Sequence, residues 1–163
     1  MYLGWAGVRH LSDPLFQSLF GGITLGVHEL GHLLLGPLGA WPGIAGGSLA
    51  QIAAPAAAAW ILGRQRDYFG VAVGAAWLAF SLFGLAAYVG DARARELPLV
   101  SLGPDPIHDW NWMLGRLGWL SADRALAGLL RAGATALWAA SMSLGAWLLW
   151  AMARSRGPRS RQA

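Results

Sequence analysis

An uninterrupted apolar run of about 22 residues, from 68 to 89, constrains this chain more than any other feature. A helix of that length crosses the ~30 Å hydrocarbon core of a lipid bilayer. Further apolar runs cover residues 15–38, 49–62 and 132–152. Only 12% of the residues are charged and the mean hydropathy is +0.45, whereas soluble domains carry about 25% charged residues. The sequence therefore predicts an all-α, polytopic integral membrane protein with about four transmembrane helices.

We expect a single transmembrane domain over residues 1–163. The uncharged, glycine- and proline-rich stretch 36–48 favours a loop or re-entrant turn between the first two spans. Residues 91–131 form the one substantially polar segment and hold five of the eight acidic residues. Its tryptophan-rich part after His108 is typical of a helix that lies in the membrane interface. A basic tail, residues 153–163, follows the last span.

The distribution of charge indicates a membrane partner and not a nucleic acid. All twelve basic residues are arginines, and no basic face interleaved with exposed aromatic residues is present. The tail arginines follow an apolar segment, as in a cytoplasmic anchor that meets anionic lipid head groups. With four spans, the N- and C-termini are then both cytoplasmic. The absence of lysine beside abundant alanine, glycine and arginine points to a bacterium with a GC-rich genome, and we expect the protein in the bacterial cytoplasmic (inner) membrane. The absence of cysteine excludes disulfide scaffolds, thiolate metal sites and cysteine nucleophiles.

Residues 28–32 read His-Glu-Leu-Gly-His inside the first predicted span. Histidines four residues apart lie on one face of an α-helix, so His28 and His32 can bind a single metal ion. Glu29 then lies beside the ion, where it can take a proton from metal-bound water. Ionisable groups at membrane depth are costly to desolvate and mark functional sites. The pattern predicts a Zn²⁺ site with Glu29 as the catalytic base, and a structural polar cluster is the alternative.

A catalytic zinc ion usually has three protein ligands and keeps a fourth position for water. No histidine or acidic residue follows within ten residues of His32, so the third ligand must come from a distant segment. His108 is the preferred candidate because neutral imidazole is the commonest zinc ligand. Asp91, which ends the third predicted span, and Asp109 are the alternatives. Asp105 of the polar segment is a further candidate. Glu96 is less favoured because it follows arginines that neutralise it, and His10 and Asp13 are less favoured because they lie more than a helix length from His28 along the chain.

The HELGH sequence at 28–32, followed by the Gly/Pro-rich stretch and by GGSLAQIAAP at 46–55, resembles the site-2 protease family of membrane-embedded zinc metalloproteases. The resemblance implies that His28 and His32 are metal ligands and that Glu29 is the general base. In that family a later transmembrane helix supplies an aspartate ligand from an N-P-D-G or L-D-G sequence. This chain has neither, and its nearest strings are VGDA at 89–92 and GPDP at 103–106.

These features lead us to expect a zinc-dependent metalloendopeptidase that hydrolyses peptide bonds of a membrane protein or peptide substrate, within or near the membrane. Two other functions stay open at this point. One is a metal-binding membrane protein without proteolytic activity, or a hydrolase that acts on a lipid-borne substrate. The other is a structural or transport protein whose polar cluster carries a proton or an ion.

Overall fold

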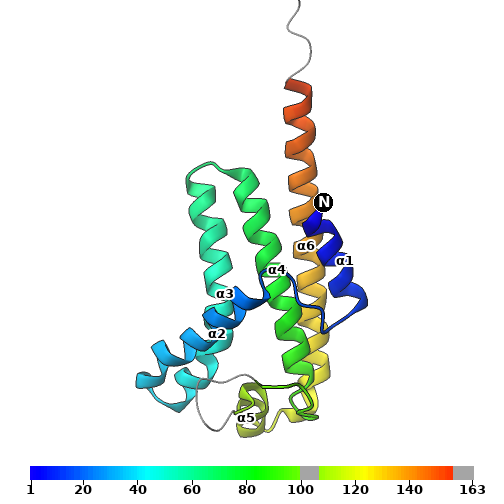
Figure 1. The fold of residues 1–163 in the computed structure, drawn as a ribbon. Coiled ribbons are helices and arrows are strands. Elements are labelled where there is room, and N and C mark those ends of the chain that lie inside the picture. The colour runs from blue at the N-terminus through cyan, green and yellow to red at the C-terminus, as the bar shows by residue number, and fades with distance from the viewer. Residues whose placement is uncertain (100–106, 156–163) are drawn as a thin grey trace, which may run out of the picture.

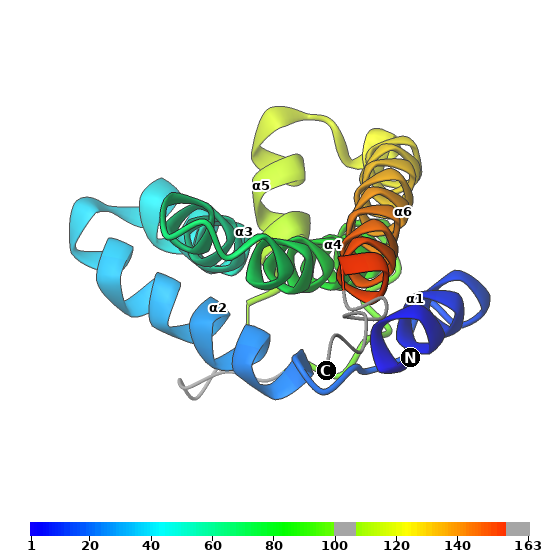
Figure 2. The same ribbon diagram turned by 90° about the horizontal axis from the view of Figure 1, so that it is seen from above.

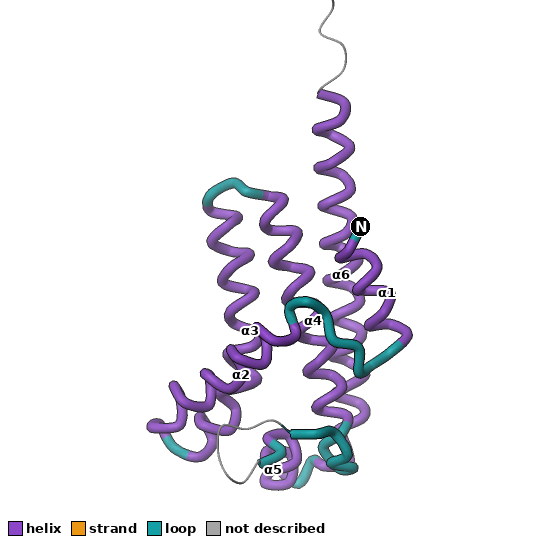
Figure 3. The backbone as a smooth tube through the Cα atoms, in the orientation of Figure 1, coloured by secondary structure: helices purple, strands orange, loops and turns teal. Residues whose placement is uncertain are grey.

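The computed structural model describes residues 1–99 and 107–155, and every regular element within them is helical. Asp105 and most of the basic tail lie outside the described residues. Figure 1 shows the arrangement of the elements, and Figure 3 shows the short turn between α3 and α4. In chain order the elements are α1 (Tyr2–Ser12), α2 (Gly21–Leu35), the 3₁₀ turn η1 (Gly36–Leu38), α3 (Ala40–Arg64), α4 (Tyr68–Gly90), α5 (Asp109–Leu117), the 3₁₀ turn η2 (Leu120–Ala122) and α6 (Asp123–Ser155).

Within the described residues, three helical segments are long and apolar enough to cross a membrane: Ala40–Arg64, Tyr68–Gly90 and Leu120–Ser155. Viewed from above, α3, α4 and α6 form a row, with α1 and α2 on one side of it and α5 on the other (Figure 2). The prediction of an all-α, polytopic membrane protein is confirmed. The turn between α3 and α4 lies at the same end of the molecule as the C-terminal end of α6, and α5 lies at the opposite end (Figure 1).

The first two predicted spans have different boundaries in the structure. Residues 15–38 do not form one helix, because α2 has 15 residues and reaches only about 22 Å. Residues 36–48 are not a loop, since α3 already begins at Ala40. Pro42 lies in the first turn of α3, where a backbone N–H has no helical partner to lose. Pro55 lies inside α3, is buried and does not end the helix. The second span is therefore the whole 25-residue helix and not the short segment 49–62.

Helices α1 and α2 lie one after the other beside the row formed by α3, α4 and α6, and the non-helical residues 13–20 interrupt them (Figure 2). Trp138 of α6 donates a hydrogen bond to the Leu3 carbonyl (3.1 Å), and Arg131 of the same helix donates to the His10 carbonyl (3.0 Å), so α1 runs antiparallel to α6. Trp77 of α4 donates to Thr24 of α2 (2.9 Å). The non-helical residues 13–20 therefore lie opposite the middle of α4.

Arg131 stabilises this interruption. The last carbonyl groups of a helix have no partner within the helix, and a bilayer offers no water to satisfy them. The Arg131 guanidinium donates to the carbonyls of His10 (3.0 Å) and Leu11 (2.7 Å) at the end of α1. A cluster of buried apolar residues packs beside it and joins α1, α4 and α6: Ala6, Ala76, Phe80, Phe83 and Ala134.

Two glycines allow α2 and α3 to cross at close range. A Cβ atom on Gly31 would collide with the carbonyl oxygen of Gly46, and a Cβ atom on Gly46 would collide with the carbonyl oxygen of Gly31. Small residues at a helix crossing let backbones approach in this way. The crossing carries the adjacent turn of α2, with His28 and His32, against the beginning of α3.

Candidate metal centre

Two histidines of α2 and the first residue of α5 form a compact group. The Nε2 atoms of His28 and His32 are 3.1 Å apart. The Asp109 Oδ2 atom is 3.2 Å from His28 Nε2 and 3.3 Å from His32 Nε2. His28 and Asp109 are buried, with 8% and 4% of their surface exposed, and His32 is half-buried. In the part of the chain that the structure describes, this is the group of histidine and acidic side chains that could hold a metal ion.

Hydrogen bonds at Nδ1 determine the tautomer of each imidazole. His32 Nδ1 lies 2.8 Å from the Gly43 carbonyl oxygen, which can only accept, so Nδ1 carries the proton. His28 Nδ1 lies 2.6 Å from Gln51 Oε1. The Gln51 amide nitrogen donates to the Ser81 carbonyl (3.2 Å), which leaves Oε1 as the acceptor facing His28. Both Nε2 atoms of the neutral side chains therefore present lone pairs, as metal-ligating histidines do.

Two nitrogen lone pairs and a carboxylate thus point at one small region. Three such groups repel one another unless a positive charge lies between them, either a proton on one imidazole or a metal ion bound by all three. Zinc bonds of about 2.0–2.1 Å at tetrahedral angles place neighbouring ligand atoms about 3.3–3.4 Å apart. The observed separations of 3.1, 3.2 and 3.3 Å match that spacing. Two histidines and one carboxylate fit a metal site that keeps a fourth position open.

Gly47 of α3 provides the space for both rings. A Cβ atom at this position would lie 2.5 Å from His28 Nε2 and 2.5 Å from His32 Nε2. The α3 backbone therefore forms one wall of the site, and only glycine leaves room there for two imidazoles.

The structure places Asp109, and not the preferred candidate His108, beside the two histidines. His108 Nε2 lies 3.2 Å from Asp91 Oδ2, and His108 Nδ1 accepts a hydrogen bond from the Asn111 backbone N–H (3.2 Å). Both ring nitrogens are thus engaged away from the site. The physical reason is position: His108 is the N-cap of α5 and Asp109 its first helical residue, so the two side chains leave the backbone in different directions.

The other predicted residues are distributed around the group. Glu29 is half-buried, and its negative charge acts on His28 and on Tyr88. Asp91 accepts hydrogen bonds from His108 and from the backbone N–H groups of Glu96 (2.9 Å) and Leu97 (3.1 Å). Its carboxylate is therefore directed away from the two histidines of α2. The Glu96 side chain is exposed. His10 and Asp13 lie in the region where α1 ends, apart from the site. Asp105 lies outside the described residues.

Sequence reasoning did not identify Gln51, Gly47 or Tyr88 as parts of this site. Gln51 is a buried amide in the otherwise apolar run 49–62, and polar groups at that depth are rare unless they have a specific partner. The position of Gln51 within an apolar run could therefore have marked it as part of the site. Tyr88 accepts a hydrogen bond from the Asp109 backbone N–H (2.9 Å) through its hydroxyl group. Its role depends on where α5 docks, which the sequence does not reveal.

An ion pair joins the helix ends next to the site. The Arg93 guanidinium bonds both carboxylate oxygens of Asp123, at 2.7 Å each. The hydrogen bond to Asp123 raises the pKa of the Arg93 guanidinium. Asp123 is buried and begins α6, whereas Arg93 follows α4. The pair therefore holds the end of α4 against the beginning of α6.

Comparison of the chain with protein-family models, curated proteins and solved structures gave no match. Function is therefore inferred from the residues of the site and from the way the fold holds them.

Proposed function

We propose that this protein is a membrane-embedded zinc metallopeptidase in which His28, His32 and Asp109 hold the metal ion and Glu29 is the general base. One observation carries the proposal. Two Nε2 lone pairs, with their tautomers set by Gly43 and Gln51, converge with a carboxylate oxygen at 3.1–3.3 Å. The glutamate of the HExxH sequence follows His28 directly in α2.

Each residue then has a defined task. When bound, zinc supplies Lewis acidity for a substrate carbonyl and for a water molecule. Glu29 takes the proton from the attacking water and later delivers it to the leaving nitrogen. Gln51 and the Gly43 carbonyl keep the two imidazoles neutral and oriented. Burial of His28 and Asp109 limits the access of bulk water to the site.

The resemblance to the site-2 protease family supports the same function. Asp109 takes the place of the family's aspartate ligand, although it comes from the first turn of the short helix α5 and not from an N-P-D-G or L-D-G sequence. The HELGH sequence packs against Gly46 and Gly47 of α3, which leave room for its backbone and its two imidazole rings. This arrangement is consistent with a zinc site on α2.

The charge distribution supports an orientation for the site. Arg64, Arg66 and Arg154 lie at the end formed by the α3–α4 turn and the C-terminal end of α6. Arginine-rich ends of membrane helices face the cytoplasm. In a bacterial inner membrane, α1 and α2 then make one interrupted crossing, and the N-terminus shares the cytoplasmic side. The candidate metal centre then lies near the non-cytoplasmic face of the membrane. There it can act on substrate peptide bonds close to the membrane boundary.

The zinc content of the purified full-length chain tests the metal centre. We expect about one zinc ion per chain in the wild type and a loss of zinc in Asp109→Ala, because two histidines alone do not complete a three-ligand site. Asp13→Ala is the matched control, since Asp13 is an aspartate at a helix end away from the site, and it keeps its zinc. Wild-type protein without stoichiometric zinc, or an Asp109→Ala variant that retains it, contradicts the proposal.

A further inference from the structure

We propose that His108 is a positioning residue that holds Asp109 in place for the metal ion, with Asp91 as its anchor on α4. This inference rests on the proposed metal centre and assigns a different role to the residue that ligand chemistry alone favours as the third ligand. Two contacts of the His108 ring carry it.

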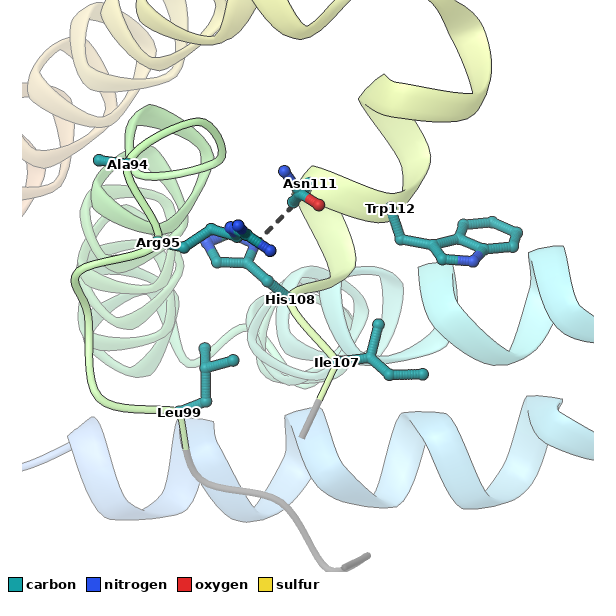
Figure 4. A pocket seen from close by; sticks show the side chains of 7 residues that line it. All are labelled: Ala94, Arg95, Leu99, Ile107, His108, Asn111 and Trp112. Carbon is teal, nitrogen blue, oxygen red and sulfur yellow. Dashed lines mark hydrogen bonds between the residues drawn. The ribbon is translucent and has the colours of Figure 1, made fainter. Parts of the chain in front are cut away.

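The first contact fixes the helix that carries Asp109. His108 is the N-cap of α5, and its Nδ1 atom accepts a hydrogen bond from the Asn111 backbone N–H at 3.2 Å (Figure 4). A side-chain acceptor at the N-cap satisfies one of the donors that the first helical turn leaves unpaired. The His108 carbonyl accepts from the Trp112 N–H at 3.0 Å. Asp109 is the first residue of this turn, so its backbone conformation depends on the cap.

The second contact fixes the turn relative to α4. Because His108 Nδ1 accepts a hydrogen bond, the neutral ring carries its proton on Nε2, which donates to Asp91 Oδ2 at 3.2 Å. Asp91 is the C-cap of α4 and is held in turn by the backbone N–H groups of Glu96 and Leu97. Asn111 adds a parallel connection, since its side-chain amide donates to the Ala92 carbonyl at 2.8 Å.

Tyr88 completes the support from the same helix. Its ring stacks on the His108 ring with the centroids 4.4 Å apart, and its hydroxyl group accepts from the Asp109 N–H at 2.9 Å. His108 and Asp109 are both buried, with 6% and 4% of their surface exposed. The network thus ties the Asp109 backbone to the end of α4, while the Asp109 carboxylate faces the histidines of α2.

This geometry also separates His108 from two other roles. A metal ligand needs a nitrogen lone pair directed at the ion, and the one lone pair of the neutral ring is taken by the Asn111 N–H. The same bond leaves no free basic nitrogen for proton transfer. An open pocket lined by Arg95, Asn111 and Trp112 lies against His108 (Figure 4), so a replacement side chain has room there.

Zinc and cobalt binding by two His108 variants of the full-length chain in detergent tests the inference. We expect His108→Ala to weaken zinc affinity by about 10- to 100-fold, as loss of a residue that orients a ligand does. His108→Asn should recover most of that loss, because asparagine is a good N-cap whose oxygen can accept the Asn111 N–H. At saturating Co²⁺, both variants should keep the visible absorption spectrum of the wild type, since the ligands are unchanged.

Three results overturn the inference. His108→Ala with wild-type zinc affinity removes the positioning role. A changed cobalt spectrum in His108→Asn identifies His108 as a ligand, and this comparison decides the matter even where His108→Ala does not fold. A zinc affinity of His108→Asn as low as that of Asp109→Ala would likewise identify His108 as a metal ligand. Failure of the wild type to bind zinc is a different outcome, because it removes the metal centre itself.

Discussion

Replacement of Glu29 by glutamine should abolish peptide cleavage and leave the zinc content unchanged. The amide has nearly the shape of the carboxylate but cannot accept a proton from water, and general base catalysis contributes about 10²- to 10⁴-fold to such reactions. Because His28, His32 and Asp109 are the proposed ligands, the metal should stay bound. The measurement is cleavage of a co-expressed transmembrane substrate, together with zinc analysis of the purified variant.

Glu96→Gln is the matched control, since Glu96 is the other glutamate of the chain and its side chain is exposed. It should cleave as the wild type does. Unchanged cleavage by Glu29→Gln removes the general-base assignment. Loss of zinc in this variant makes Glu29 part of the metal site. Stoichiometric zinc in a wild-type protein that cleaves no membrane substrate favours the alternative of a metal-binding protein without proteolytic activity.

A single methyl group added at Gly47 of α3 should disrupt the metal centre, because this position faces the two histidine rings of α2. In Gly47→Ala the new Cβ atom would lie 2.5 Å from the Nε2 atoms of both histidines, far inside the ~3.5–4.0 Å at which nonbonded atoms attract one another. The rings must move, and they then lose their alignment with Gln51 and the Gly43 carbonyl. We expect zinc affinity to fall by about 10- to 100-fold or more.

Gly63→Ala makes the same change on the same helix, where the new Cβ atom meets Val71 at an ordinary 3.5 Å. Its zinc affinity should equal that of the wild type, and competition with a chelating dye measures both variants. Equal affinity of Gly47→Ala and the wild type would show that the two Nε2 atoms do not meet a metal ion beside Gly47.

Local patterns in the sequence predicted the parts of this protein that depend on local physics. The uninterrupted apolar run 68–89 became α4 (Tyr68–Gly90), because a helix that is apolar on all sides needs only lipid or other helices around it. The spacing of His28 and His32 placed their rings side by side on α2, since residues four apart share a helix face.

The remaining features depend on contacts between distant segments. Glycine and proline content favoured a loop at 36–48, but two of these glycines lie in α3, where Gly46 meets Gly31 of α2 and Gly47 leaves room for the two imidazoles. The interruption at 13–20 depends on Arg131 of α6, which is more than a hundred residues away. The third ligand was ambiguous because His108 and Asp109 are neighbours. The contact of His108 with Asp91 decides which of the two faces the site.

X-ray absorption at the zinc edge tests the central claim most directly, because it counts the imidazole ligands of the bound ion in the full-length protein. The account predicts two imidazole nitrogens, from His28 and His32, with the remaining ligands oxygen atoms at about 2.0–2.2 Å. It also predicts that Asp109→Ala loses the metal, because two histidines alone do not complete a three-ligand site. A spectrum with three imidazoles, or with none, would contradict the assignment of His28, His32 and Asp109 as the metal centre.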